Sequence, residues 1–387
     1  MVNKKIAFII FIFVLVISSY LSYSFFSKGE AAGLLPSVKY KPPTTNGKIV
    51  KSNEQESKTE ECPLNGQLWG ASSKQKWESR RPLGIMIENS VPARPQSGLS
   101  AADIIYEAVA EGGITRFLTI FYCQDASYVG PVRSARIYFI RLLQEYGIYP
   151  LYAHVGGANT DGPADALGEI DELGWGLYND LNQFGVPFPF YWRDYERLPG
   201  RVTEHTVYTA TAKLWDFAKN KRNLTNVDKK DRSWDEKFEK WKFREEAAKE
   251  DRGDLTKVSF TFWNIFSADY AVDWTYDKIT NSFKRNNGGV PHFDKNTNKQ
   301  LEAKNIVVVF SKESEANDGY PGGHLLYKLT GSGEGLIFQD GRVIETSWTK
   351  KTEESRMKFF DGTGKEVAFV RGQIWVEILP VGNKVTY

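Results

Sequence analysis

The sequence has few of the residues that usually mark a metal or nucleotide site. Of its 387 residues only two are cysteines and four are histidines. No cysteines stand at the CxxC spacing of a zinc site, and there is no HExxH motif. The GxSxG nucleophile turn and the GxxxxGK[ST] phosphate loop are also absent. These absences remove the commonest motifs for zinc, serine-hydrolase and nucleotide chemistry, and we expect no metal and no cofactor.

A strong charge of one sign is also lacking. The formal net charge is +2, whereas nucleic-acid binding usually needs a strongly basic face. Apolar residues make up 41% of the chain and aromatic residues 14%, which is enough for two ordinary domains with cores of their own. We therefore expect a two-domain protein that does not bind nucleic acid.

The longest apolar run lies near the start of the chain. Residues 6–26 are apolar apart from serines and tyrosines, and Lys4 and Lys5 precede them. A run of about 20 apolar residues can cross a membrane as one helix, and lysines before it place the N-terminus in the cytoplasm. The alternative is a cleaved signal peptide, since Ala31 and Ala32 follow. Either interpretation predicts export, and the first predicts a single-pass protein of the cell membrane.

The two cysteines are Cys62 and Cys123. In an oxidising compartment they could form one disulfide that ties the segment before the first domain to that domain. They could equally remain as two buried or free thiols. Neither cysteine directly follows the apolar run, where a lipid-attachment site would lie.

Changes in composition divide the rest of the chain. Residues 27–78 are rich in polar residues and proline and predict a flexible spacer. Residues 79–222 alternate strand-like and helix-like patterns, which is typical of an α/β layered domain. The expected order is strand 83–88, helix 101–110, strand 114–122, helix 134–146, strand 149–155 and a later helix 209–219.

The second half is expected to be mostly β. Residues 223–256 form a charged mixture that predicts a connector or a solvated amphipathic helix. Residues 257–387 contain several strand-like runs, and Asp340–Gly341 is a strong hairpin signal. The predicted fold is thus an α/β layered N-terminal domain plus a mostly-β C-terminal domain, behind one N-terminal transmembrane helix.

Polar residues follow three of the predicted strands. In open α/β sheets, ligands bind beyond the carboxyl ends of the strands. If these strands are parallel, the rule brings together Arg94, Arg133, Arg136 and His154. We predict a ligand-binding rim there.

Arg133 and Arg136 stand at the start of a predicted helix, where a cation is disfavoured unless an anion is near. A bound phosphate, sulfate or carboxylate could supply that anion. The alternative is an internal partner, for which Asp125, Glu107 and Glu111 are the candidates.

Glu107 and Glu111 are four residues apart and would share one face of the predicted helix. Paired carboxyl groups could be the general acid and base of a glycan hydrolase. The alternative is an ion pair, with Arg116 the obvious partner of Glu111.

His154 and an aromatic cluster are further candidates. His154 could act as an acid/base or ligand donor, or it could be a packed core histidine. Aromatic side chains gather in residues 184–195, beside Arg193 and Asp194. Flat rings flanked by polar groups suit a sugar-binding site, but aromatics are also ordinary core residues.

Several strings of residues resemble the YerB-like lipoprotein family. They are Arg81-Pro-Leu-Gly-Ile-Met-Ile-Glu-Asn89, Ala93-Arg-Pro-Gln-Ser-Gly-Leu99, Ala102-Asp-Ile-Ile-Tyr-Glu107, Glu111-Gly-Gly-Ile-Thr-Arg-Phe117, Gly130-Pro-Val-Arg-Ser-Ala-Arg136, Arg285-Asn-Asn-Gly-Gly-Val-Pro-His292, Asp340-Gly-Arg342 with Ser347–Trp348, and Gly372-Gln-Ile-Trp375. The resemblance spans residues 80–387 and implies a bacterial, exported, two-domain protein. The family's activity is undefined, so it assigns no catalytic residues.

Three functional hypotheses follow. The leading one is a non-catalytic envelope module that binds an anionic cell-wall component through the Arg133/Arg136 rim. The second is a cell-wall glycan hydrolase that uses Glu107, Glu111 or His154. The third is a scaffold that recruits another envelope protein, for example through an exposed strand edge.

Overall fold

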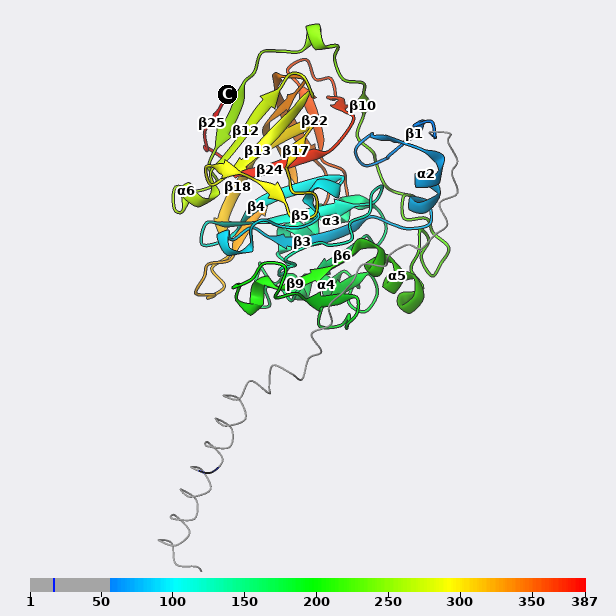
Figure 1. The fold of residues 1–387 in the computed structure, drawn as a ribbon. Helices are drawn as coiled ribbons and strands as arrows, with labels where there is room; N and C mark the ends of the chain where they lie inside the picture. Colours follow the sequence, from blue (N-terminus) through cyan, green and yellow to red (C-terminus); the bar gives the residue numbers. More distant parts are fainter. Residues whose placement is uncertain (1–16, 18–55) are drawn as a thin grey trace, which may run out of the picture. The chain divides into compact units, whose positions relative to one another are not determined.

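One large mixed sheet runs through the folded part of the molecule. The structure, a computed structural model, describes residue 17 and residues 56–387. Within that part, eleven strands form a sheet in the order β22-β21-β20-β18-β24-β4-β5-β3-β6-β7, and β19 pairs with β18 off this path. In chain order these strands are β3 (Leu83–Glu88), β4 (Ile104–Glu111), β5 (Ile114–Phe121), β6 (Leu151–His154), β7 (Asp180–Asn182), β18 (Asn305–Glu315), β19 (Leu325–Lys328), β20 (Gly331–Gln339), β21 (Arg342–Lys350), β22 (Lys358–Asp361) and β24 (Ile374–Pro380). The sheet joins strands from both halves of the chain (Figure 1).

Strand β24 joins the two halves, because it lies between β4 and β18 and is parallel to both. Ile374 is in register with Ile104 on one side and with Asn305 on the other. Trp375 is fully buried, and its ring packs edge-on against Phe117 of β5 at 5.5 Å. Residues close to the C-terminus therefore complete the core of the N-terminal half.

Most of residues 101–110 belong to the strand β4 and not to the predicted helix. Only the short 3-10 turn η3 (Leu99–Ala101) precedes β4, and β4 and β5 form an antiparallel hairpin. Gly112 and Gly113 lie at its tip with φ angles of 58° and 82°, as a type I′ turn requires. A glycine pair between two apolar runs is a hairpin signal, and here it outweighs the pattern that predicted a helix over residues 101–110.

Short helices accompany the strands of the N-terminal half. They are α2 (Ala71–Trp77), α3 (Ile137–Leu143), α4 (Ala166–Glu172) and α5 (Thr211–Arg222). The 3-10 turn η4 (Gln144–Tyr146) extends α3, so a helical segment is confirmed within predicted residues 134–146. The remaining elements of this half are η2 (Val91–Ala93), η5 (Thr203–His205) and the hairpin of β8 (Tyr191–Arg193) with β9 (Val207–Thr209).

Strands dominate residues 257–387, as the sequence predicted. A second sheet has the order β14-β13-β12-β11-β25, with β17 beside β13. Its strands are β11 (Lys257–Phe260), β12 (Val272–Asp277), β13 (Ser282–Asn287), β14 (Val290–Pro291), β17 (Glu302–Ala303) and β25 (Val385–Thr386), with the helix α6 (Ser267–Tyr270) and the pair β15 (Phe293–Asp294) and β16 (Lys299–Gln300) nearby. The predicted turn at Asp340–Gly341 is confirmed, since it joins β20 to β21 with both φ angles positive.

Residues 56–78 are folded, although the sequence assigns them to a spacer. They contain β1 (Glu60–Glu61), β2 (Leu68–Trp69) and α2. Cys62 is bonded to Cys123, so the disulfide alternative is the one that the structure has. Polar composition misled the prediction here, because a disulfide can hold a segment that buries little apolar surface.

Residues 223–256 do not form the solvated helix that was one alternative. They contain the 3-10 turn η6 (Lys249–Asp251) and β10 (Phe243–Arg244), which pairs with β23 (Phe369–Val370). Trp234 and Trp241 are each only 3% exposed. The segment is a connector that buried tryptophans anchor to the core.

The predicted membrane segment, residues 6–26, lies outside the described residues apart from Ile17. Residues 27–55 of the predicted spacer lie outside them as well. Within the part of the chain that is described, no helix is long and apolar enough to cross a membrane.

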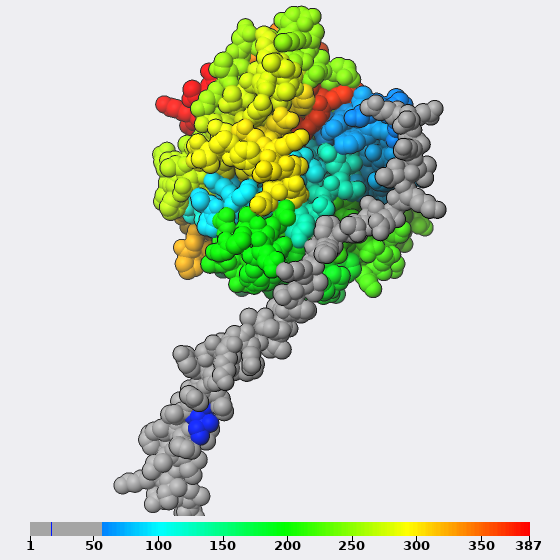
Figure 2. All heavy atoms as spheres, in the orientation of Figure 1, coloured from blue at the N-terminus to red at the C-terminus, as the bar shows by residue number. Residues whose placement is uncertain are grey.

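Hydrogen bonds also connect the two halves at the surface. Figure 2 shows residues near 290–300 (yellow) lying against the N-terminal half (green and cyan). Arg197 donates to the Asn296 side chain over 2.5 Å. The Asp294 carboxylate accepts from the Gly98 amide and the Ser100 hydroxyl at 3.1 and 2.7 Å. The two halves therefore form a continuous folded unit.

Candidate functional site

The predicted rim is assembled by a route that the sequence did not predict. Strands β3 and β6 are parallel, so their carboxyl ends lie at one edge, but β5 runs antiparallel to β3. The chain returns to this edge after β5, where Val132 bridges to Ile87 and Ala135 to Gly157. Arg133 and Arg136 consequently lie beside the end of β6.

Arg133 lies between two carboxylates at this edge. Its Nε is 3.5 Å from Glu88 and its Nη2 is 3.3 Å from Glu204. His205 Nδ1 is 2.7 Å from the other Glu88 oxygen, and the Ser90 hydroxyl donates to Glu88 at 2.9 Å. The Arg133 charge is thus largely balanced within the protein.

Arg136 is held by an internal carboxylate, as one alternative predicted. Glu111 accepts from Arg136 Nε at 2.8 Å and from Arg116 Nη2 at 2.6 Å. Burial raises the pKa of Glu111, but the two guanidinium groups outweigh it and hold this pKa below its ordinary value. Burial lowers the pKa of Arg116 to about 10. Arg116 and Arg136 are only 5% exposed, so an external anion has little access to this cluster.

Glu107 and Glu111 project from opposite faces of the sheet. A β-bulge between Val109 and Glu111 shifts the register by one residue, and such a shift reverses the face. Glu107 is fully buried against Arg285 at 2.6 Å, whereas Glu111 faces Arg116. The structure therefore does not bring the two carboxyl groups together as a catalytic pair.

His154 is a packed core histidine. It is fully buried, and its ring nitrogens each lie 2.7 Å from an oxygen, one of Asp180 and one of Gly156. The aromatic side chains of residues 184–195 do not all face solvent, since Trp192 is buried while Phe184 is 77% exposed.

The other predicted binding residues have local partners. Arg94 donates to the Asn89 carbonyl at 2.9 Å and to the Asp269 carbonyl at 2.8 Å. Burial lowers the pKa of Arg94. Arg193 donates to the Thr203 carbonyl at 2.6 Å, and Asp194 accepts from the backbone amides of the turn that follows it. These contacts order the loops at the edge.

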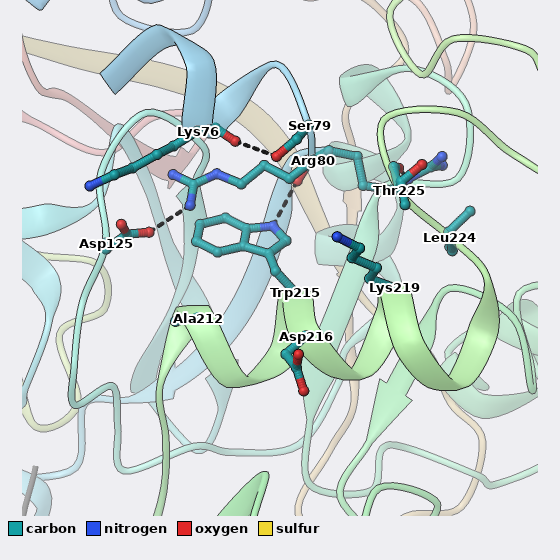
Figure 3. Close-up of a pocket in the computed structure, with 11 residues that line it drawn as sticks. Lys76, Ser79, Arg80, Asp125, Ala212, Trp215, Asp216, Lys219, Leu224 and Thr225 are labelled. Carbon is teal, nitrogen blue, oxygen red and sulfur yellow. Dashed lines mark hydrogen bonds and ion pairs between the residues drawn. The ribbon is translucent and has the colours of Figure 1, made fainter. Parts of the chain in front are cut away.

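A cationic pocket lies elsewhere, between α2 and α5 (Figure 3). Its volume is about 300 Å³, at the small end of the range for ligand sites. Four cationic side chains and two carboxylates line it, together with Trp215 and small or apolar residues. The cationic residues are Lys76, Arg80, Arg81 and Lys219, and the carboxylates are Asp125 and Asp216.

Arg80 and Trp215 form one wall of the pocket. The Arg80 guanidinium lies 3.5 Å from the centre of the indole ring and donates to Asp125 at 2.6 Å. The indole N–H donates to the Arg81 carbonyl at 2.9 Å. Helix α5 presents Trp215 because Leu214, Trp215 and Ala218 form its buried side. Hydrogen bonds therefore hold both the indole ring of Trp215 and the guanidinium plane of Arg80 in place.

Arg81 is a buried cation without a carboxylate partner among the described residues. It is 1% exposed and donates to the carbonyls of Thr225, Ile148 and Tyr149 at 2.5, 2.8 and 3.0 Å. Its Nη2 has no hydrogen-bond partner within the described chain. Burial lowers the pKa of Arg81 to about 10, so its charge remains at neutral pH and contributes to the positive potential of the pocket.

Lys76 and Lys219 line the pocket from α2 and from α5 (Figure 3). Both are exposed, and neither has an ion-pair partner among the described residues. Each lies in the last turn of its helix, where the helix dipole favours a cation by a few tenths of a kcal/mol. That preference accounts for one lysine at each helix end but leaves both ammonium groups available to an anion.

The disulfide positions the two sides of this pocket. Cys123 precedes the loop that carries Asp125, and Cys62 precedes α2. Asp103 lies beside the bridge and accepts from the amides of Tyr122 and Cys123 at 2.7 and 2.9 Å. Asp103 and the two cysteines are close enough to hold a metal ion, but the sulfurs are bonded to each other and offer no thiolate.

Asp103 should make stability depend on pH. Burial raises its pKa to about 6, above the unfolded value of about 4. The folded state therefore holds this proton more tightly, so the contribution is present at low pH and is lost as the pH rises through about 6. Between about pH 4 and 7 we expect the difference in unfolding free energy between Asp103→Asn and the native chain to change by up to about 3 kcal/mol. Urea unfolding at several pH values checks this, and parallel pH profiles would contradict it.

Comparison with known proteins identifies the family. Residues 68–225 match the family described as "Protein of unknown function (DUF3048) N-terminal domain", and residues 260–376 match its C-terminal domain. The chain belongs to the YerB-like DUF3048 family. The cationic pocket lies wholly within the N-terminal match. The family resemblance read from the sequence, and its two-domain organisation, are confirmed.

The similarity to YerB of Bacillus subtilis (strain 168) extends along most of both chains. YerB, which is named as a candidate lipoprotein, is 32% identical over 318 residues, or 82% of this chain and 86% of YerB. The crystal structure of YerB matches with a TM-score of 0.67 at 30% identity, covering 85% of this chain and all of that one. The fold described above is therefore shared with a solved YerB-like structure.

Sequence reasoning did not find the pocket. Arg80 and Arg81 were visible only as polar residues before a buried strand, and Trp215 as one apolar residue of a helix. The pocket forms because α2 and residues 79–81 meet α5 in space, although about 140 residues separate them in sequence. An adjacent arginine pair entering a buried strand was the one available signal.

Proposed function

We propose that this protein is a membrane-tethered, extracytoplasmic envelope protein that binds an anionic cell-wall polymer without catalysis. The envelope location rests on the similarity to YerB, which is named as a candidate lipoprotein, and on the apolar run at residues 6–26. Residues 6–26 would act as a single-pass anchor with the N-terminus in the cytoplasm. Residues 56–387 would then face the wall.

The observation that carries the proposal is the excess of positive charge in the pocket. Lys76 and Lys219 have no ion-pair partner in the described chain, and Arg81 adds a buried charge behind them. Counting only partners within residues 56–387, Arg80 is the one cation of the pocket with a carboxylate partner, Asp125. Phosphate or carboxylate groups would complete this arrangement, because an anion pairs best where cations converge in a partly desolvated cavity.

The site replaces the Arg133/Arg136 rim in the proposal. Arg136 already holds Glu111, and Arg133 lies between Glu88 and Glu204. The hydrolase alternative predicts an open pair of carboxyl groups, whereas Glu107 is fully buried. A binding role for the pocket is therefore favoured over hydrolysis by these glutamates.

Replacing the two exposed lysines of the pocket should weaken binding of anionic polymers. Each exposed cation contact is worth up to about 1 kcal/mol, so Lys76→Gln with Lys219→Gln should lower affinity about 5- to 30-fold. Titration calorimetry with a soluble glycerol-phosphate oligomer, and separately with a polycarboxylate, measures the effect. The two probes distinguish phosphate from carboxylate recognition.

The matched control is Lys221→Gln with Lys237→Gln. Both are exposed lysines that do not line the pocket, so the double control changes net charge equally. Equal losses in the two double variants would mean that only overall charge matters and would contradict a site. Binding to the native chain should also weaken as salt rises, because salt screens exposed charges.

A further inference from the structure

A second pocket lies in the C-terminal half, at the carboxyl ends of the parallel strands β18 and β24. Its volume is about 590 Å³, well within the range of small-molecule sites. Three stretches line it: residues 261–265, Glu313 near the end of β18, and Pro380 with residues 382–384. Helix α6, β18 and β25 lie on the same side of the molecule in Figure 1.

The location has a physical reason. Parallel strands end at one edge, and the loops beyond them leave a crevice in which ligands commonly bind. Here β4 is also parallel to β24, and its hairpin tip at Gly113 lies against Ile265. Asn383 donates to the carbonyls of Thr261 and Phe262 at 2.8 and 2.7 Å. The walls of the crevice are therefore held by three strand ends and by direct hydrogen bonds.

Glu313 and Trp263 form the chemical centre of this pocket. The Trp263 indole N–H donates to Glu313 Oε1 at 2.9 Å, and the Tyr327 hydroxyl donates to Oε2. The carboxyl group is half-buried and has no ion-pair partner in the described chain. Burial raises its pKa, and the two hydrogen bonds oppose that rise. Burying such a carboxyl group costs free energy unless further hydrogen-bond donors reach its free lone pairs.

The pocket offers what a sugar needs. A sugar presents apolar C–H faces together with hydroxyls that both donate and accept hydrogen bonds. Trp263 supplies an apolar ring, Glu313 supplies acceptors, and Asn264 and Lys384 supply exposed donors. A single carboxyl group lines the pocket among the described residues, so the acid/base pair of a glycosidase is missing and binding is the supported role.

We propose that this pocket binds a short neutral glycan, with a sugar face against Trp263 and sugar hydroxyls donating to Glu313. The proposal is independent of the cationic pocket, because the two sites share no residue. A protein with both sites would hold a glycan strand and an attached anionic polymer at different points.

Fluorine NMR of the full chain in detergent, labelled with 5-fluorotryptophan, tests the proposal. Trp263→Phe identifies the Trp263 signal among the 11 tryptophans. Titration with chitotriose should shift that signal. Glu313→Gln keeps the shape of the side chain but loses its charge, and it should weaken binding about 5- to 30-fold. Trp263→Ala lacks the reporter signal, so titration calorimetry measures this variant, and it should bind chitotriose at least about tenfold more weakly.

The controls separate this site from the rest of the molecule. Phe188 is 56% exposed and outside both pockets, so Phe188→Ala should leave chitotriose binding unchanged, as should Lys76→Gln with Lys219→Gln. Unchanged signals from the other tryptophans show that each variant is folded. An unmoved Trp263 signal at millimolar chitotriose, or equal weakening in Phe188→Ala, would overturn the proposal.

Discussion

Replacing Arg285 with alanine is expected to lower the free energy of unfolding by about 3–5 kcal/mol, the usual effect of breaking a buried ion pair. Arg285 lies on β13 of the second sheet and reaches into the large sheet. Its Nη2 is 2.6 Å from Glu107 of β4, and its Nη1 is 3.0 Å from Glu377 of β24. All three side chains are fully buried. The substitution would leave two carboxyl groups buried without a cation.

The surroundings of this network support a large effect. Burial and the neighbouring Glu107 raise the pKa of Glu377, and Arg285 opposes that rise. Burial lowers the pKa of His292 far below its ordinary value, which fits a neutral ring accepting from Arg285 Nε at 3.2 Å. The guanidinium also lies 4.6 Å from the Trp375 ring. Arg285 therefore contacts partners on β4 and β24 and the His292 ring at once.

Arg342→Ala is the matched control, because Arg342 is exposed on β21 and donates only to the Asp251 carbonyl among the described residues. It should change stability by less than about 1 kcal/mol. Denaturant unfolding followed by two probes measures both variants and tests for a single transition. An Arg285→Ala midpoint equal to that of Arg342→Ala would show that the network does not hold the two sheets together.

Removing the disulfide should have an effect of similar size. Cys62 and Cys123 are 61 residues apart, and the loop-entropy relation for a loop of that length gives about 4 kcal/mol. Cys62→Ala with Cys123→Ala should therefore lower the unfolding midpoint strongly. It should also weaken binding of anionic polymers, because the bridge ties the segment before α2 to the loop that carries Asp125 of the pocket.

Unfolding of the native chain with and without a reducing agent checks the first effect, and calorimetry of the double variant checks the second. The double variant itself serves as the control for the reducing agent, since it should not respond to it. A midpoint that reduction leaves unchanged would contradict a stabilising role for the bridge. Unchanged polymer affinity in the folded double variant would show that binding does not depend on how the disulfide positions α2.

Local patterns predicted the pieces of this fold better than their arrangement. The strand at residues 83–88 and the turn at Asp340–Gly341 follow from apolar runs and turn residues within a few positions of each other. The pairing of β24 with β4 joins residues about 270 positions apart, and no local signal encodes such a contact. The site depends on the same kind of contact, so its residue types were visible but their convergence was not.

Charge patterns were ambiguous for a related reason. Arg136 at a helix start predicted either a bound anion or an internal partner. The partner is Glu111, the last residue of β4 in the β4–β5 hairpin. Glu111 and Glu107 lie on opposite faces of the sheet because of one bulged residue. A sequence shows that such charges must be balanced, and the tertiary structure decides by what.

Co-sedimentation with purified cell-wall sacculi tests the central claim most directly. The full chain would be mixed with native sacculi and with sacculi stripped of their anionic polymers, and the supernatant would be analysed by mass spectrometry. We expect the chain to pellet most strongly with native sacculi, to pellet much less with stripped ones or when Lys76 and Lys219 are replaced by glutamine, and to release no fragments. Equal pelleting with stripped sacculi, or release of glycan fragments, would contradict the account.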